Sequence, residues 1–328
     1  MEKRRLGRTE IQITPIGLGC WQFGQGGAIF ARFWSPLDQN VITDTVAAAL
    51  KSGINWFDTA EIYGSGSSEQ ALATALSSLK SPPGEAVIAT KWFPLFRSAR
   101  SIRSTIKARL ECLSPYPIDL HQVHQPFSHS PISAQMAEMA SLLKEGLIKS
   151  IGVSNFSARQ MEEAHSALAK LGIPLASNQI RYNLLDRRIE ANGILDSAKR
   201  LGVTLIAYSP LAQGLLSGRF HDDPSQTRTL PRVRRLSFSP AGRSYRPENL
   251  ARTRPLIDEL RQVATTHDAT PSQIALAWLI THYGDTVVAI PGATRFEQAA
   301  DNAAAMRIEL AHDELARLGE ASERVARG

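Results

Sequence analysis

The sequence predicts an α/β fold of the closed (β/α)8 TIM-barrel type, and three observations support this. Eight short apolar segments with the character of buried strands alternate with segments of helical periodicity. Ionisable residues follow the ends of several strands, where a parallel barrel places its reactive side chains. Gly24, Gly26 and Gly27 follow the first strand but lack the G-x-G-x-x-G spacing typical of an open dinucleotide-binding sheet. Because no linker-like segment divides the chain, we expect a single barrel domain over residues 1–328.

The strands are predicted from short runs of apolar and β-branched residues. At the N-terminus, residues 9–14 alternate between polar and apolar and, together with residues 3–6, predict a β-hairpin that precedes the barrel. The barrel strands are then expected at residues 16–21, 54–57, 86–89, 118–123, 148–153, 175–180, 203–208 and 286–290.

The helices are predicted from their periodicity and from the residues that stop them. Gly53, Gly146, Gly172 and Gly202 each end one helix, and the Pro-Pro-Gly at 82–84 ends another. The helices are expected at residues 38–51, 68–79, 98–113, 131–145, 157–171, 189–201, 250–266, 271–282, 296–305 and 313–326.

One segment departs from the compact alternation. Residues 218–249, after the seventh strand, are rich in Pro, Ser and Arg and predict a long loop. Its arginines include Arg228, Arg232, Arg234, Arg235, Arg243 and Arg246. A loop of this length inside a barrel is most often a lid over a ligand, and a solvated excursion is the alternative.

The composition excludes several classes of protein. The formal net charge of +6 suits an anionic ligand or simply a basic surface. No apolar run reaches the ~18 residues of a membrane helix, and the basic N-terminus lacks the apolar stretch of a secretory signal. Cys20 and Cys112 are the only cysteines and have no metal-like spacing. We therefore expect a cytoplasmic protein without a metal, a membrane or a nucleic-acid partner; the oligomeric state stays open.

Four ionisable residues lie at successive strand ends. Asp58 and Tyr63 belong to the segment Asp-Thr-Ala-Glu-Ile-Tyr-Gly after the second strand, Lys91 follows the third, and His124 follows the fourth. Each has an ordinary alternative: a helix N-cap for Asp58, a loop aromatic for Tyr63, a surface lysine and a core histidine. Their places at consecutive strand ends favour one shared site.

These side chains are the components of an acid–base catalyst. A phenol has an unperturbed pKa of ~10, and the ammonium of Lys91 would make Tyr63 a stronger acid. Asp58 could pair with Lys91, and His124 could hydrogen-bond at the same oxygen. The set could protonate a carbonyl oxygen as negative charge develops on it. The accompanying hydride requires a nicotinamide cofactor, because no side chain can donate one.

Over essentially its whole length, the chain resembles the aldo-keto reductase family. Asp58, Tyr63, Lys91 and His124 match the catalytic tetrad of that family, which implies that Tyr63 is the general acid. The resemblance implies the reversible reduction of an aldehyde or ketone to the alcohol.

The resemblance also implies a site for NADPH, with NADH possible. The nicotinamide would contact Ser154, Asn155, Gln179 and Tyr208, the pyrophosphate would lie against Ser209, Leu211 and Gln213, and the adenosine end would contact Gly292, Thr294, Arg295, Gln298 and Asn302. Arg295 is the candidate for gripping a 2′-phosphate, and a solvent-exposed helix-start arginine is the alternative. Gly292 and Ala293 stand where some relatives have Lys and Ser, which weakens the preference for NADPH.

Aromatic residues predict an apolar pocket for an aryl or alkyl carbonyl. The candidate wall residues are Trp21, Trp92 and Phe127, with Phe23, Phe30, Phe33, Trp34 and Phe93 as further aromatics near strand ends. Ordinary packing is the alternative for each of them. Gln125 stands where some relatives carry Trp, which would make the pocket more polar there.

Two other functions stay open. A nucleotide-binding regulatory or redox-sensing protein would keep this fold, as channel-associated members of the family do, although the intact tetrad disfavours it. A barrel lyase or aldolase would instead use Lys91 as a Schiff-base amine.

Overall fold

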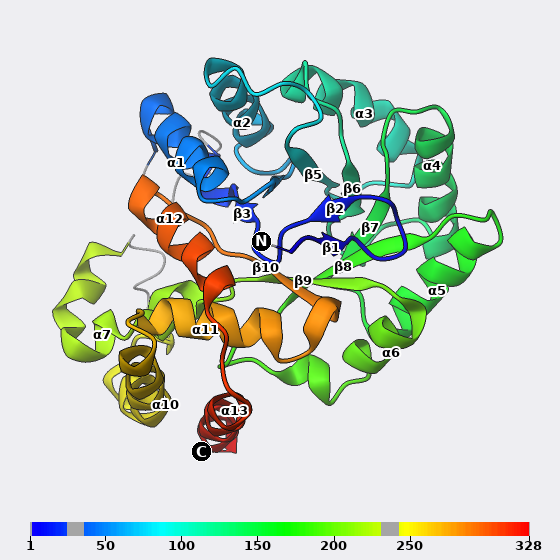
Figure 1. Cartoon of the computed structure of the whole chain (residues 1–328). Coiled ribbons are helices and arrows are strands. Elements are labelled where there is room, and N and C mark those ends of the chain that lie inside the picture. The colour runs from blue at the N-terminus through cyan, green and yellow to red at the C-terminus, as the bar shows by residue number, and fades with distance from the viewer. Residues whose placement is uncertain (1, 25–35, 231–242, 328) are drawn as a thin grey trace.

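The computed structural model describes residues 2–24, 36–230 and 243–327 and confirms the predicted barrel (Figure 1). Eight parallel strands are hydrogen-bonded in chain order from β3 to β10. Their bounds are β3 Leu18–Gly19, β4 Trp56–Asp58, β5 Val87–Trp92, β6 Leu120–Val123, β7 Ile151–Ser154, β8 Leu175–Arg181, β9 Thr204–Tyr208 and β10 Val287–Ile290. Two isolated parallel bridges, Ile16 to Ala289 and Gly19 to Gly292, join the last strand to the first and close the ring.

Helices surround the strands on the outside (Figure 1). The helices between and after the strands are α1 Gln39–Lys51, α2 Ser67–Ser78, α3 Arg100–Leu113, α4 Ile132–Lys144, α5 Ala158–Ala169, α6 Ile194–Leu201, α11 Pro271–Thr281 and α12 Phe296–Ala304. Two more, α10 Pro247–Thr266 and α13 His312–Arg327, lie outside this ring and pack together, with the Arg252 guanidinium donating to the carbonyl of Val325. The apolar residues between strands and helices form the larger core.

The predicted N-terminal hairpin is present and covers the N-terminal end of the barrel. Strand β1 Arg4–Arg5 pairs antiparallel with β2 Gln12–Ile13. The Trp56 indole N–H donates to the carbonyl of Thr14 at 2.8 Å, and the Gly7 N–H donates to Thr204 Oγ1 at 2.7 Å. Gly7 has φ +57°, and a Cβ there would lie 2.4 Å from the carbonyl oxygen of Ala176. The close approach of hairpin and barrel therefore requires glycine at this turn.

The barrel interior has two layers that follow from strand alternation. Its apolar layer comprises Leu6, Ile13, Trp56, Ala89, Leu120, Ala176, Ile206, Val288 and Ile290. Because side chains two residues apart on a strand point to the same face, the next inward positions after Trp56, Ala89, Leu120 and Ile206 hold Asp58, Lys91, Gln122 and Tyr208. A polar layer thus lies above an apolar plug, toward the C-terminal ends of the strands.

Several predicted elements have different bounds. The helix expected at residues 189–201 begins only at Ile194, because Gly193 has φ +81° and cannot continue a helix from the 3-10 turn Arg188–Glu190. The first strand ends at Gly19, and Trp21–Phe23 form a 3-10 turn.

The predicted loop 218–249 contains ordered turns of helix, so its reading as a plain loop was wrong in part. Helix α7 spans Arg219–Asp222, and a 3-10 helix spans Pro224–Thr229. The latter is started by the Asp223 side chain, which accepts from the N–H of Ser225, with Pro224 at the first helical position. Arg232, Arg234 and Arg235, and likewise Gly26, Gly27, Phe30, Phe33 and Trp34, lie outside the described residues.

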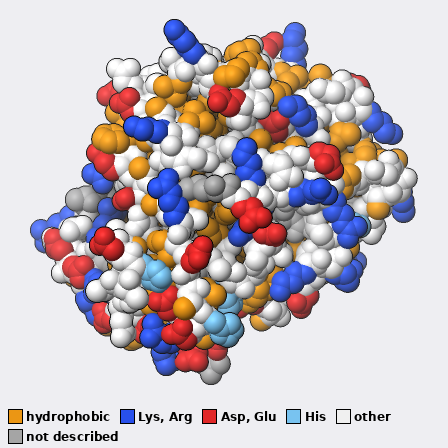
Figure 2. All heavy atoms as spheres, viewed as in Figure 1, with side chains coloured by type: hydrophobic (Ala, Val, Ile, Leu, Met, Phe, Trp, Pro, Cys, Tyr) orange, Lys and Arg blue, Asp and Glu red, His pale blue; other side chains and the backbone are white. Residues whose placement is uncertain are grey.

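Figure 2 shows the face that carries the N-terminal hairpin. On this face, Lys and Arg side chains are interspersed with Asp and Glu and with apolar side chains. Within the described ranges, no helix is long and apolar enough to cross a membrane. The same residues contain no group of three or more His, Cys, Asp or Glu arranged to hold a metal ion.

Candidate active site

A buried ion pair between Lys91 and Asp58 lies at the centre of the polar layer. The Lys91 Nζ is 2.5 Å from Asp58 Oδ1, and the two side chains are 0% and 2% exposed. The ammonium also donates to the carbonyl of Thr59 at 2.8 Å and to Tyr63 Oη at 3.4 Å. All three N–H groups of the lysine therefore have an acceptor, which a buried charge requires.

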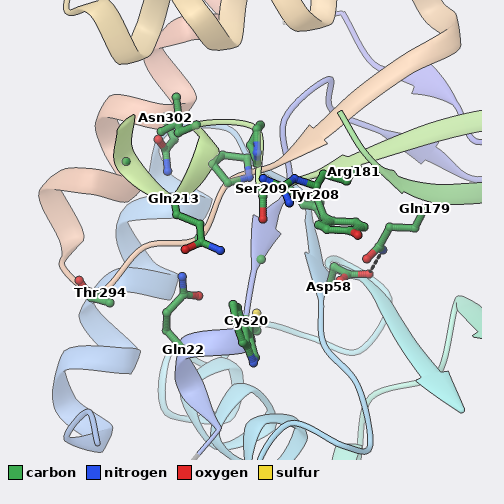
Figure 3. A pocket seen from close by; sticks show the side chains of 18 of the residues that line it. Cys20, Gln22, Asp58, Gln179, Arg181, Tyr208, Ser209, Gln213, Thr294 and Asn302 are labelled. Carbon is green, nitrogen blue, oxygen red and sulfur yellow. Dashed lines mark hydrogen bonds between the residues drawn. The ribbon is translucent and has the colours of Figure 1, made fainter. Parts of the chain in front are cut away.

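The other oxygen of Asp58 is also satisfied. Its Oδ2 accepts from the side-chain amide of Gln179 at 2.8 Å (Figure 3). The same oxygen accepts from the side-chain amide of Gln122 at 3.1 Å. The carboxylate is therefore held on both sides, and its charge is directed at the ammonium.

The pKa of Lys91 is raised. Burial lowers it, but the charge of Asp58 and the contacts with Asp58 and Tyr63 together outweigh burial. The amine is therefore a protonated cation at neutral pH. A Schiff-base lysine must be neutral to attack a carbonyl, so this environment disfavours the aldolase alternative.

The pKa of Tyr63 is also raised, contrary to the expectation that Lys91 would lower it. Burial raises the pKa most strongly, and the field of Lys91 lowers it without compensating. The phenol consequently stays protonated at neutral pH and is a proton donor in this state.

His124 is neutral beside the phenol. Burial and the nearby Lys91 charge hold its pKa well below the ordinary value. Its ring lies edge-on to the Tyr63 ring, with centroids 5.8 Å apart. A neutral imidazole here can hydrogen-bond to a ligand oxygen without adding a second positive charge.

A cavity of about 800 Å³ opens in front of these residues. Asp58, Tyr63 and His124 line it, and Lys91 lies behind them. Every residue that the resemblance assigned to the cofactor also lines it: Ser154, Asn155, Gln179, Tyr208, Ser209, Leu211, Gln213, Gly292, Thr294, Arg295, Gln298 and Asn302. The structure thus brings both predicted sets of residues to one cavity.

One end of the cavity is formed by a connected set of polar groups. The Tyr208 hydroxyl donates to Asn155 Oδ1 at 3.0 Å, and Asn155 Nδ2 donates to the carbonyl of His124 at 3.2 Å. The Ser154 hydroxyl donates to the carbonyl of Gln179 at 2.9 Å. Asn155 has φ +62°, a conformation that asparagine tolerates better than most residues.

The middle of the cavity is bordered by a tightly turned segment after β9. Ser209, Gln213 and Gly214 all have positive φ, so the backbone curls back along the cavity. Two contacts hold the turn: Asn183 Nδ2 donates to the carbonyl of Ser209, and the Tyr245 hydroxyl donates to the carbonyl of Gln213, both at 3.0 Å.

The far end of the cavity lies at the start of α12. Arg295 occupies the N-cap position, and Gln298 Oε1 accepts from the N–H of Thr294 at 2.8 Å. Asn302 is 5% exposed, and its Nδ2 has no hydrogen-bond partner among the described residues. In Figure 3 this amide lies at the edge of the cavity. This buried donor is therefore available to an acceptor of a ligand in the cavity.

Of the aromatic wall predicted from sequence, only part lines the cavity. Trp21 and Phe93 do. The prediction was wrong for Trp92, which follows the inward-pointing Lys91, so its side chain points out toward α3 and donates from its indole to Ser101 at 3.0 Å. Phe127 does not line the cavity either and is 48% exposed. Phe23 is fully buried and is ordinary packing.

Gln22 also lines the cavity and was missed in the sequence. Its amide lies opposite Gln213 (Figure 3), and a Cβ at residue 292 would be 2.1 Å from Gln22 Nε2. Gln22 therefore fills the space that a side chain at residue 292 would need, which explains Gly292 physically. No sequence motif indicates this pairing, since the two residues are distant along the chain.

Arg181, Arg219 and Gln122 were missed as well. Arg181 and Arg219 line the cavity, and Gln122 contacts Asp58. Strand alternation could have found two of them, because Gln122 lies two residues after the inward Leu120 and Arg181 two after Gln179.

Comparisons with known proteins agree with this arrangement. Residues 15–323 match the sequence profile of the Aldo/keto reductase family. An uncharacterized oxidoreductase of Mycobacterium tuberculosis is 39% identical over 91% of this chain and 86% of its own length. The NADH-specific methylglyoxal reductase of Escherichia coli is 30% identical over 100% of both chains. The glycerol dehydrogenase of Gluconobacter oxydans superposes with a TM-score of 0.85 at 28% identity, covering 100% of this chain and 97% of the other.

The barrel and its acid–base set define an oxidoreductase. The chain belongs to the aldo-keto reductase family.

Proposed function

We propose that this protein reversibly reduces an aldehyde or ketone to the alcohol and prefers NADPH. The observation that carries the proposal is the Tyr63 hydroxyl, which lies 3.4 Å from the buried Lys91 ammonium and beside neutral His124 at the cavity. A carbonyl oxygen held there would meet a protonated donor and a fixed positive charge.

The cavity residues fit a nicotinamide cofactor. Asn302 offers an unpartnered amide at one end, and the connected set of Ser154, Asn155 and Tyr208 offers polar groups and an aromatic ring at the other. The cofactor, when bound, would supply the hydride. Arg219 and Arg181 line the cavity and would attract its phosphates.

The preference for NADPH rests on Arg295. Arg295 lines the cavity, and its guanidinium could bind a 2′-phosphate as a fork. The E. coli relative is named as NADH-specific, and Gly292 and Ala293 provide no second cation here. The preference is therefore proposed to depend on this one arginine.

Tyr63 would protonate the substrate oxygen. Lys91 would stabilise the negative charge that develops on this oxygen and on the phenol, and Asp58 would keep the lysine charged. His124 would orient the carbonyl by a hydrogen bond. In the oxidation direction, the phenolate would take the proton back.

Two measurements test the proposal together. Quenching of the five tryptophans should show saturable binding of NADPH, because Trp21 lies in the cavity. Tyr63→Phe should lower kcat for an aldehyde by at least about 100-fold while leaving NADPH affinity unchanged, since only the proton donor is lost.

A matched control is Tyr116→Phe, which removes a buried hydroxyl that donates to Ser81 away from the cavity. This variant should keep wild-type turnover. Wild-type turnover in Tyr63→Phe, or no binding of either NADPH or NADH, would contradict the proposed function.

A further inference from the structure

An exposed apolar surface lies on the loops that follow β5 and β6. It consists of Leu95, Phe96 and Phe127, which are 44%, 83% and 48% exposed, and we call it the apolar ledge. Of the five large hydrophobic side chains that stand exposed in the described part of the chain, three belong to this ledge. With Ser128 and His129 they line a shallow depression. Such a grouping is typical of a binding surface, whereas exposed apolar residues scattered singly are ordinary.

The apolar ledge is connected to the candidate active site through aromatic contacts. The Phe93 ring lines the cavity and lies edge-on to His124 at 5.6 Å between centroids. The same ring lies edge-on to Phe127 at 6.1 Å. Ring contacts therefore link His124, beside the proposed proton donor, through Phe93 to Phe127 in the ledge.

The two loops that carry the ledge are tied together by polar contacts. The Arg97 carbonyl accepts from the Ser128 hydroxyl at 3.0 Å and from the N–H of His129 at 3.2 Å. The Arg97 guanidinium pairs with Glu61 and donates to the carbonyl of Phe93 at 2.9 Å. The ledge is therefore held in a defined position relative to the cavity before any ligand arrives.

Phe96 has a conformation that packing does not explain. Its φ is +56°, which is strained for a bulky residue, and its ring is the most exposed of the three. The strained φ opposes folding, and the exposed ring gains no stabilising burial to offset it. A strained residue that is also exposed points to a role in binding.

We propose that the apolar ledge is the outer part of the substrate site and binds the apolar tail of the carbonyl substrate. This rests on the proposed function. The substrate class is an aldehyde or ketone with a medium-length alkyl chain or an aryl extension, whose carbonyl lies at Tyr63 and whose tail passes Phe93. The lining of the depression includes no carboxylate or guanidinium, so an uncharged tail fits it.

The test compares propanal with decanal as substrates of the wild type and of the double variant Phe96→Asn, Phe127→Ser. Asparagine tolerates the backbone conformation at residue 96, and both positions are exposed, so the fold should be kept. The wild type should have a higher kcat/KM for decanal. The double variant should lower kcat/KM for decanal by about tenfold and leave propanal within about twofold, since lost apolar burial of ~1.4 kcal/mol is a factor of ten.

A control variant is Leu171→Ser, which removes an equally exposed apolar side chain (45%) just after α5. It should change neither substrate. An equal effect of the double variant on both chain lengths, or no effect on decanal, would overturn the proposal. The proposal would also be overturned if the wild type sedimented as a dimer, the double variant sedimented as a monomer, and the kinetics with decanal were unchanged. A second copy of the chain would then cover the ledge. Failure of the wild type to reduce propanal would instead contradict the proposed function.

Discussion

The side-chain amide of Gln179 donates a hydrogen bond of 2.8 Å to Oδ2 of Asp58. Gln179 was expected at the cofactor and Asp58 in the tetrad, so this contact joins the two sets. Ser154 extends the connection, because its hydroxyl donates to the Gln179 carbonyl. The Asp58 carboxylate therefore keeps Lys91 charged and also fixes the side chain of Gln179, which lines the cavity.

The substitution Asp58→Asn tests how much this carboxylate contributes to folding stability and to the reaction rate. The substitution leaves the Lys91 ammonium buried without a counter-charge, so the variant should lose about 3–5 kcal/mol of unfolding free energy and at least about 100-fold in kcat. Urea unfolding and initial rates would measure both. Glu145→Gln is the control, because it breaks a pair with Arg103 in which both side chains are exposed, and it should cost at most ~1 kcal/mol. Comparable losses in the two variants would show that burial of the pair does not matter.

The pH dependence of the rate follows from the pKa values at the site, which are raised for Tyr63 and Lys91 and lowered for His124. Reduction needs protonated Tyr63, whose pKa is raised, so kcat/KM should be flat from about pH 6 to 9 and fall only at higher pH. Oxidation of the alcohol needs the phenolate and should rise with pH. The pKa of His124 is well below its ordinary value, so neither profile should bend near ~6.5. A bend there that His124→Gln removes would show that the imidazole titrates.

The origin of the cofactor preference can be tested by comparing alanine variants of two arginines, Arg295 and Arg219. Arg295→Ala should raise the Kd for NADPH about tenfold and leave NADH unchanged, because a charge-assisted hydrogen bond to a 2′-phosphate is lost. Arg219→Ala should weaken both cofactors by similar factors, since both carry the same pyrophosphate. Fluorescence titration of the two variants gives all four constants. An equal effect of Arg295→Ala on NADPH and NADH would show that Arg295 does not bind the 2′-phosphate.

The fold and most of the candidate site could be predicted because they depend on local pattern. Each strand is a short apolar run, and Asp58, Lys91 and His124 lie at or just after strand ends, which the barrel topology brings together. The direction of a side chain was predicted less well. Trp92 was wrongly expected in the pocket wall. Side chains alternate along a strand, so the residue after the inward-pointing Lys91 points outward.

What the sequence could not provide is the outcome of opposing effects and of distant contacts. Lys91 lowers the pKa of Tyr63, but the burial that outweighs it depends on the whole barrel. The pairing of Gln22 with Gly292 joins opposite ends of the chain and follows no spacing rule. Glu69 is a further case, since nothing in the sequence shows that this helix carboxyl is buried.

Glu69 lies fully buried behind the active-site strands. Its Oε1 accepts from the Thr90 hydroxyl at 2.6 Å, and its Oε2 lies 3.0 Å from the Arg109 guanidinium. Burial raises its pKa to about 7, while Arg109 and Thr90 act in the opposite direction and Glu61 adds to the rise. The folded protein therefore binds a proton here at pH values where the unfolded chain, with an ordinary carboxyl, has released it.

This carboxyl should make stability fall as pH rises. Because the folded pKa lies above the unfolded value of 4.5, stability is fully present below about pH 4.5 and is lost toward pH 7, by about 3 kcal/mol. Glu69→Gln keeps the hydrogen bond to Thr90 but cannot titrate. The unfolding free energy of the wild type relative to this variant should therefore decrease by most of that amount between pH 5 and pH 8 in urea titrations. Glu162→Gln, at the exposed pair with Arg200, should show no such decrease. A constant difference between wild type and Glu69→Gln would mean that Arg109 keeps Glu69 ionised throughout.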